Sequence, residues 1–126
     1  MSELTLAGYR QLVDEWINTI GVTYYSELTN TTILMEEVGE LARIMARVYG
    51  EQSFKRPEDE ASAMTDMGDE MADILFVLVC LANQTGIDLE AAVERNIAKK
   101  TMRDKERHAS NEKLQKRLAE TKNSND

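Results

Sequence analysis

The segment LMEEVGELARIMARV, residues 34–48, indicates the fold class of this chain. Its large apolar residues recur at alternating steps of three and four, which is the spacing of one face of an α-helix. The apolar members of this stripe are Leu34, Leu41, Ile44 and Val48. Glu37 occupies the remaining position, so a carboxylate stands where a core residue is expected. Burying an unpaired carboxylate costs several kcal/mol, and this break in the pattern therefore points to a functional site.

A second apolar segment carries the same interruption. Residues 71–82 are apolar almost all round, as expected of a buried central helix, yet Asp73 interrupts them and Glu70 lies one turn earlier. On the first segment, Glu40 lies one turn after Glu37 and flanks it. Four carboxylates close together would repel one another unless they were protonated or neutralised by a cation.

Three explanations fit these acid pairs. In the first, they are structural acids that point outward or pair with Arg43 and Arg47, although helical spacing puts both arginines beside Glu36. The second is a di-iron carboxylate bundle, which normally needs Glu-x-x-His pairs. The only histidine, His108, is far along the chain from both acid pairs. The third is a hard cation held by oxygen ligands alone, as suits magnesium, and the all-carboxylate set favours it.

The rest of the pattern predicts an all-α chain. Proline occurs once, good helix formers are abundant, and no stretch alternates apolar and polar residues long enough to suggest a sheet. The expected helices are residues 6–20, 26–49, 57–84 and 89–108. The inward face of the first is expected to hold Leu6, Tyr9, Leu12, Val13, Trp16 and Ile20. We therefore expect one domain, residues 1–108, followed by a polar helix or tail at 109–126.

Composition narrows the class of protein. A chain of 126 residues with 42% hydrophobic and 30% charged residues suits one soluble globular domain. The single cysteine, Cys80, allows no internal disulfide and indicates a reducing compartment, so we expect a cytoplasmic protein. The N-terminus does not resemble a secretory signal, and no apolar run reaches the ~20 residues that span a bilayer, so no membrane association is expected.

Charge is distributed unevenly along the chain. Residues 1–94 carry 18 acidic and 5 basic side chains, whereas residues 95–126 carry 5 acidic and 10 basic ones. The formal net charge of -8 argues against duplex nucleic acid as a partner, because phosphate neutralisation needs clustered Lys and Arg. The basic end is either a solvated tail or a binding surface for phosphates.

Four motifs follow one another along the chain: EEVGELA at 36–42, DEMADIL at 69–75, GIDL at 86–89, and NIAK at 96–99 followed by Arg103. Together they resemble the MazG family of all-α nucleoside triphosphate pyrophosphohydrolases. The resemblance implies a four-helix bundle completed by oligomerisation, as a homodimer or homotetramer. It also implies magnesium-dependent cleavage, with manganese as an alternative metal, of (deoxy)nucleoside triphosphates to monophosphate and pyrophosphate in nucleotide-pool housekeeping.

The resemblance also assigns site residues. The metal-binding acids correspond to Glu37, Glu40, Glu70 and Asp73, and Glu36 completes the catalytic set as a base or a further ligand. The phosphate-contacting positions correspond to Asn96, Lys99 and Arg103, whose spacing puts them on one helix face. Among the aromatic residues near the N-terminus, Trp16 is the preferred candidate for stacking on the base, with a core or subunit contact as the alternative.

Two other functions stay open from the sequence. One is a non-catalytic helical oligomer that binds a nucleotide or a protein partner and keeps the acids only as structure. The other is an enzyme like phosphoribosyl-ATP pyrophosphohydrolase, which shares the acid pattern. The stretch from 50 to 69 is long for a compact family member, so no substrate contact is transferred to it.

Overall fold

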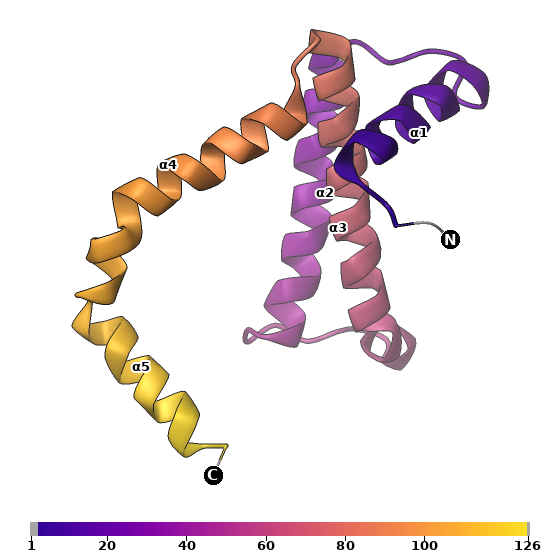
Figure 1. Ribbon diagram of the computed structural model, residues 1–126. Helices are drawn as coiled ribbons and strands as arrows, with labels where there is room; N and C mark the ends of the chain where they lie inside the picture. The colour runs from indigo at the N-terminus through magenta and orange to yellow at the C-terminus, as the bar shows by residue number, and fades with distance from the viewer. Residues whose placement is uncertain (1–2, 126) are drawn as a thin grey trace. The chain divides into compact units, whose positions relative to one another are not determined.

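The computed structural model describes residues 3–125, and all the regular secondary structure in this range is helical (Figure 1). The helices are α1 (Leu6–Thr19), α2 (Glu27–Val48), α3 (Pro57–Thr85), α4 (Leu89–Ala109) and α5 (Glu112–Asn123). The all-α prediction is confirmed, and each boundary of the first four helices lies within one residue of its expected position. The chain divides into two units, one ending at Asp88 and the other beginning at Leu89.

Local capping explains where the helices of the first unit begin and end. The Thr5 and Ser26 hydroxyls accept hydrogen bonds from the backbone amides three residues later, which supplies partners for free amides at the starts of α1 and α2. Pro57 opens α3, since its fixed φ suits a first helical turn. Gly86 ends α3 with a φ of 70°, a left-handed conformation that glycine adopts at little cost.

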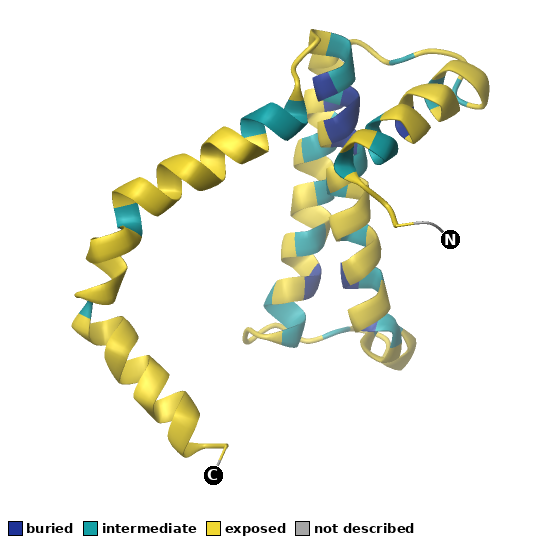
Figure 2. Ribbon diagram, in the orientation of Figure 1, coloured by how far each residue is buried: buried dark blue, intermediate teal, exposed yellow. Residues whose placement is uncertain are grey.

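The hairpin of α2 and α3 holds the core of the first unit (Figure 2). Ile44 of α2 is buried against Ala63 and Met67 of α3. Leu41 and Val48 pack around this cluster, so the apolar stripe on α2 faces α3 as its spacing predicts. The acidic position in the same stripe, Glu37, is thereby directed toward α3 as well.

The predicted inward face of α1 is only partly buried. Val13 is buried, whereas Leu12, Trp16 and Ile20 are exposed, so their expected burial is wrong within one chain. The physical reason is that α1 packs chiefly on α3, and a single neighbouring helix covers only a narrow stripe.

Apolar stripes also remain exposed on the hairpin. On α3 the exposed residues are Met64, Met71, Leu75 and Leu78, and on α2 they are Leu28, Met35, Val38 and Met45. Each set recurs at helical spacing, so each forms a stripe along its helix. The expectation that residues 71–82 are buried all round is therefore wrong for a single chain, because α1 and α2 cover only part of the α3 surface.

The second unit consists of α4 and α5, in which no residue is buried. The Asn111 side chain accepts hydrogen bonds from the amides of Lys113 and Leu114 and so caps α5. The open choice between a helix and a tail for the last stretch is thus resolved as a helix over most of its length. No single helix of residues 3–125 meets the length and hydropathy needed to cross a bilayer.

Candidate functional site

Three carboxylates meet where the acidic positions of α2 and α3 face each other. Glu37 of α2 and Glu70 and Asp73 of α3 each place a carboxylate oxygen within 4.8 Å of the others. Glu37 and Glu70 are half-buried and Asp73 is exposed. The two acid positions on α3 are three residues apart, so they project from the same side of the helix toward Glu37. We call Glu37, Glu70 and Asp73 the acid cluster.

The acid cluster is electrostatically strained as an isolated group. One oxygen of Glu70, Oε2, is buried without a hydrogen-bond partner among the described residues. The pKa of Glu70 is raised to about 7, first by its hydrogen bond with Glu37, then by burial and the negative charges of Glu37, Asp73 and Glu40. Burial, followed by the charge of Glu37, also raises the pKa of Asp73. The cluster therefore favours either a proton or a cation among its oxygens.

A pH dependence of stability follows from Glu70. Its pKa is about 7 in the folded protein against 4.5 for the free side chain, so between these values the folded state retains a proton that the unfolded state loses. Without divalent cations, the Glu70 contribution to the free energy of unfolding is therefore expected to decrease as pH rises from 4.5 to 7. Urea denaturation in EDTA at several pH values measures the trend. Glu70→Gln should flatten it, and an unchanged slope in that variant would contradict the assignment.

The other two acidic candidates lie outside the acid cluster. Glu40 is exposed, and its Oε2 lies 3.4 Å from Nε of Arg43, although its charge contributes to the raised pKa of Glu70. Glu36 is exposed. Arg43 pairs with Glu40, so one of the four acids has the arginine partner that the first explanation allows, and Arg47 donates to the Arg43 carbonyl. An i, i+3 pair on the helix surface accounts for the contact with Glu40.

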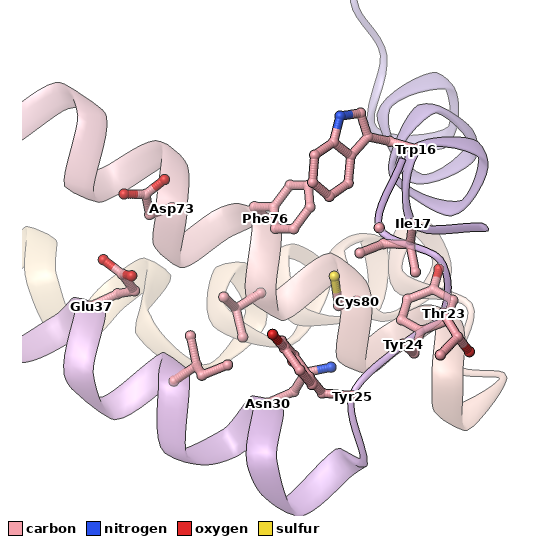
Figure 3. A pocket seen from close by; sticks show the side chains of 13 residues that line it. Trp16, Ile17, Thr23, Tyr24, Tyr25, Asn30, Glu37, Asp73, Phe76 and Cys80 are labelled. Atoms are coloured by element: carbon pink, nitrogen blue, oxygen red, sulfur yellow. The ribbon is translucent and has the colours of Figure 1, made fainter. Parts of the chain in front are cut away.

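A cavity of about 460 Å³ adjoins the acid cluster, with walls from α1, the connection between α1 and α2, α2 and α3 (Figure 3). Glu37 and Asp73 lie at one end of it. Trp16 and Phe76 lie on its wall as an edge-to-face pair, with ring centroids 5.7 Å apart and planes at 87°. Burial raises the pKa of the Cys80 thiol, also on the wall, to about 11, so that group stays neutral. Flat rings and an apolar wall beside carboxylates suit a ligand with a planar end and a charged end.

The predicted phosphate-contacting residues belong to α4 in the second unit. Asn96, Lys99 and Arg103 are all exposed. Arg103 donates from Nε and Nη2 to the two carboxylate oxygens of Asp104, at 3.0 and 2.7 Å. This contact lowers the pKa of Asp104 and occupies the Nε and Nη2 edge of the guanidinium group. A phosphate on Arg103 would either displace Asp104 from that edge or use the remaining N–H donors of the guanidinium group.

Sequence reasoning identified Trp16, Glu37 and Asp73 around the cavity but missed Phe76 and Asn30. Helical spacing in the sequence relates both residues to the acidic positions. Asn30 precedes Glu37 by seven residues, or about two turns, and thus continues its stripe on α2. Phe76 follows Asp73 by three residues and so lies on a neighbouring part of the α3 surface. The edge-to-face contact between Phe76 and Trp16 depends on how α1 packs, which no local pattern predicts.

Comparison with known proteins matches the chain to one family. The model of the MazG nucleotide pyrophosphohydrolase domain matches residues 25–108, which include α2, α3 and nearly all of α4. YpjD of Bacillus subtilis is 43% identical over 107 residues, covering 85% of this chain and 93% of YpjD. YvdC of the same organism is 31% identical over 104 residues, covering 79% of this chain and 96% of YvdC.

Two solved structures have a similar fold. The structure of Bacillus subtilis YpjD matches with a TM-score of 0.68 at 39% identity, covering 82% of this chain and all of that one. The crystal structure of the Bacillus-conserved MazG protein, a nucleotide pyrophosphohydrolase, matches with a TM-score of 0.64 at 33% identity, covering 79% of this chain and 92% of that one. The range that the family model matches, residues 25–108, includes Glu37, Glu70 and Asp73.

Proposed function

Because the chain belongs to the MazG nucleotide pyrophosphohydrolase family, and is therefore a hydrolase acting on nucleotide phosphoanhydrides, we propose that it cleaves (deoxy)nucleoside triphosphates between the α and β phosphates. The products are a monophosphate and pyrophosphate, and the role is nucleotide-pool housekeeping in the cytoplasm. The acid cluster at the end of an aromatic-lined cavity carries this proposal. Such a cavity accommodates a base while leaving the phosphates near the carboxylates. We assign the activity to residues 1–108, with 109–126 as an appended polar segment.

A divalent cation fits the acid cluster by the chemistry of its donors. All three members supply carboxylate oxygens, and one of these oxygens is buried without a hydrogen-bond donor. We propose Mg²⁺, with Mn²⁺ as the alternative, held by Glu37, Glu70 and Asp73 with Glu40 as a fourth ligand. When bound, the metal would offset charge on the phosphate oxygens and lower the pKa of an attacking water.

The remaining residues position the substrate or move a proton. Glu36, next to Glu37 in the sequence and exposed to solvent, is proposed as the base that takes a proton from the attacking water. Asn96, Lys99 and Arg103 would hold the polyphosphate, with Arg103 using the N–H donors that Asp104 leaves free or releasing Asp104. Trp16 would stack on the base, and Phe76 would keep its ring in place through their edge-to-face contact.

We propose that the protein acts as a homodimer or homotetramer. The exposed stripes on α2 and α3 contain eight large apolar side chains, a pattern that marks an association surface. Successive residues are about 100° apart around a helix, so Met71 follows Glu70 in the chain but projects from a different side of α3. A second subunit packed on these stripes would cover the apolar side chains, and because Asp73 is exposed in a single chain, the proposed assembly is also expected to close the open side of the acid cluster.

Product analysis tests the proposed reaction. The purified protein is incubated with Mg²⁺ and a panel of ribonucleoside triphosphates, deoxyribonucleoside triphosphates and phosphoribosyl-ATP, and the products are separated by anion exchange. Monophosphate and pyrophosphate are expected, and EDTA should stop their formation. Diphosphate and phosphate as products would mean that another bond is cleaved. Turnover of phosphoribosyl-ATP alone would favour a phosphoribosyl-ATP pyrophosphohydrolase. No turnover of any nucleotide would favour a non-catalytic binding protein.

A further inference from the structure

The cavity wall contains one buried polar side chain among the described residues, Asn30 in the first turn of α2, which is 5% exposed. A buried carboxamide offers two N–H donors and an acceptor oxygen, and leaving them unpaired is costly. Nδ2 of Asn30 donates to Oε1 of Gln84 on α3 at 2.7 Å. No hydrogen bond among residues 3–125 ends on Oδ1 of Asn30, so its acceptor is available to a ligand.

The orientation of Asn30 is enforced by a chain of hydrogen bonds. Nε2 of Gln84 donates to the backbone carbonyl of Tyr25, and a carbonyl can only accept. Gln84 therefore directs Oε1, an acceptor, toward Asn30. Asn30 in turn has to donate to it from Nδ2. In Figure 3 the Asn30 nitrogen lies on the side of the residue away from Glu37. The opposite atom of the carboxamide, Oδ1, is thereby assigned to the side facing the rest of the cavity.

The Tyr25 carbonyl, which accepts the hydrogen bond from Gln84, belongs to a segment that is itself held in place. Asn83, next to Gln84, donates from Nδ2 both to the Arg10 carbonyl and to the Tyr24 hydroxyl, each at 3.1 Å. The Tyr24 hydroxyl donates to Asp14 at 2.7 Å. The connection between α1 and α2 also holds Val22 at a φ of 70°, a conformation that persists for a branched residue only where the surroundings impose it. The end of α3 thus anchors the segment that carries Tyr25.

We propose that Asn30 recognises the base of the nucleotide, with Oδ1 accepting a hydrogen bond from an exocyclic amino group, and that Gln84 is the positioning residue that fixes this orientation. The proposal rests on the proposed function and specifies its substrate class: cytosine and adenine nucleotides rather than uracil or hypoxanthine ones. A base that carries a keto oxygen in place of the amino group would set two acceptors against each other. Such a site discriminates strongly because the mismatched complex leaves a buried acceptor unpaired.

The position of Asn30 in the cavity agrees with this substrate class. Trp16 and Phe76 supply flat rings to the same cavity, and Glu37 and Asp73 lie at one end of it (Figure 3). A base held at Asn30 would therefore direct its phosphates toward the acid cluster. The same α2 stripe that contributes Glu37 contributes Asn30 two turns earlier, so one helix supplies both the base contact and a metal ligand.

Matched pairs of substrates test the proposal: dCTP against dUTP, and dATP against dITP, which differ at the amino or keto position. The intact protein is expected to favour the amino member of each pair by about tenfold or more in kcat/KM. Gln84→Leu and Asn30→Ala should each bring this ratio close to one, mainly by raising KM for the amino member while kcat changes little. Thr85→Ala is the control, because its hydroxyl bonds only to carbonyls of its own helix, and it should keep the wild-type ratio.

Binding of non-hydrolysable nucleotides separates failure of this proposal from failure of the proposed function. Calorimetry with the α,β-imido analogues of dCTP and dUTP should give the same preference and its loss in Gln84→Leu, even if no nucleotide is hydrolysed. Three results would overturn the role of Asn30 without contradicting the proposed reaction. They are hydrolysis without preference within the pairs, a preference for the keto members, and an unchanged ratio in a folded Gln84→Leu protein. If Asn30→Ala fails to fold, the Gln84→Leu variant and the nucleotide analogues still test the proposed role of Asn30.

Discussion

Glu70→Gln is expected to lower kcat by about two to three orders of magnitude and, in the absence of metal, to make the protein more stable. The amide keeps the size of the side chain but removes the charge that a divalent cation needs, and stabilisation of the charge that develops on the phosphates is a large part of catalysis. Above pH 7 the variant should be more stable than the unchanged protein, because the amide removes the repulsion that raises the pKa of Glu70 to about 7. Steady-state kinetics at saturating Mg²⁺ and urea denaturation in EDTA measure the two effects.

Glu60→Gln serves as the control for that experiment. It makes the same chemical change on the same helix, in the first turn of α3 and outside the acid cluster. Its kcat should stay close to that of the unchanged protein. A Glu70→Gln protein with full activity would exclude Glu70 as a metal ligand, and a folded variant that loses activity but still binds Mg²⁺ with unchanged affinity would do the same.

Leu75→Glu is expected to convert the oligomer into monomers and to abolish most of the activity. Leu75 lies in the exposed stripe of α3, 43% exposed in a single chain, between Met71 and Leu78. Burying an unpaired carboxylate at the proposed interface costs several kcal/mol, so the dissociation constant should rise by about a hundredfold or more. Light scattering over a range of protein concentrations measures the mass, and the product assay measures the activity.

Thr65→Glu is the matched control, because residue 65 is exposed on α3 but lies about 100° from the stripe. It introduces the same charge and should leave the oligomer intact. A stable monomer of the unchanged protein with full activity would refute the proposed assembly, since the acid cluster would then need no second subunit.

Many features of the fold could be read from short stretches. The α2 stripe of Leu41, Ile44 and Val48 faces the core as its spacing predicts, and α3 ends at Thr85, within one residue of the expected position, with Gly86 as its cap. These features depend on residues within a few turns of one another, so local pattern predicts them. The partner of Arg43 stayed open in the sequence because more than one acid lies within reach of its side chain on the helix surface, and spacing alone does not choose between them.

The sequence by itself determined the helices, the acidic breaks in two apolar stripes, and therefore the acids from which a cation site would be built. Only the tertiary structure decided which of them converge: Glu37, Glu70 and Asp73 meet, while Glu40 turns to Arg43. It also decided how the carboxamide of Asn30 is oriented, through contacts that join positions 54 and 59 residues apart. The physical reason is that helix periodicity is a property of neighbouring residues, whereas the direction of a buried polar group is set by partners from distant segments.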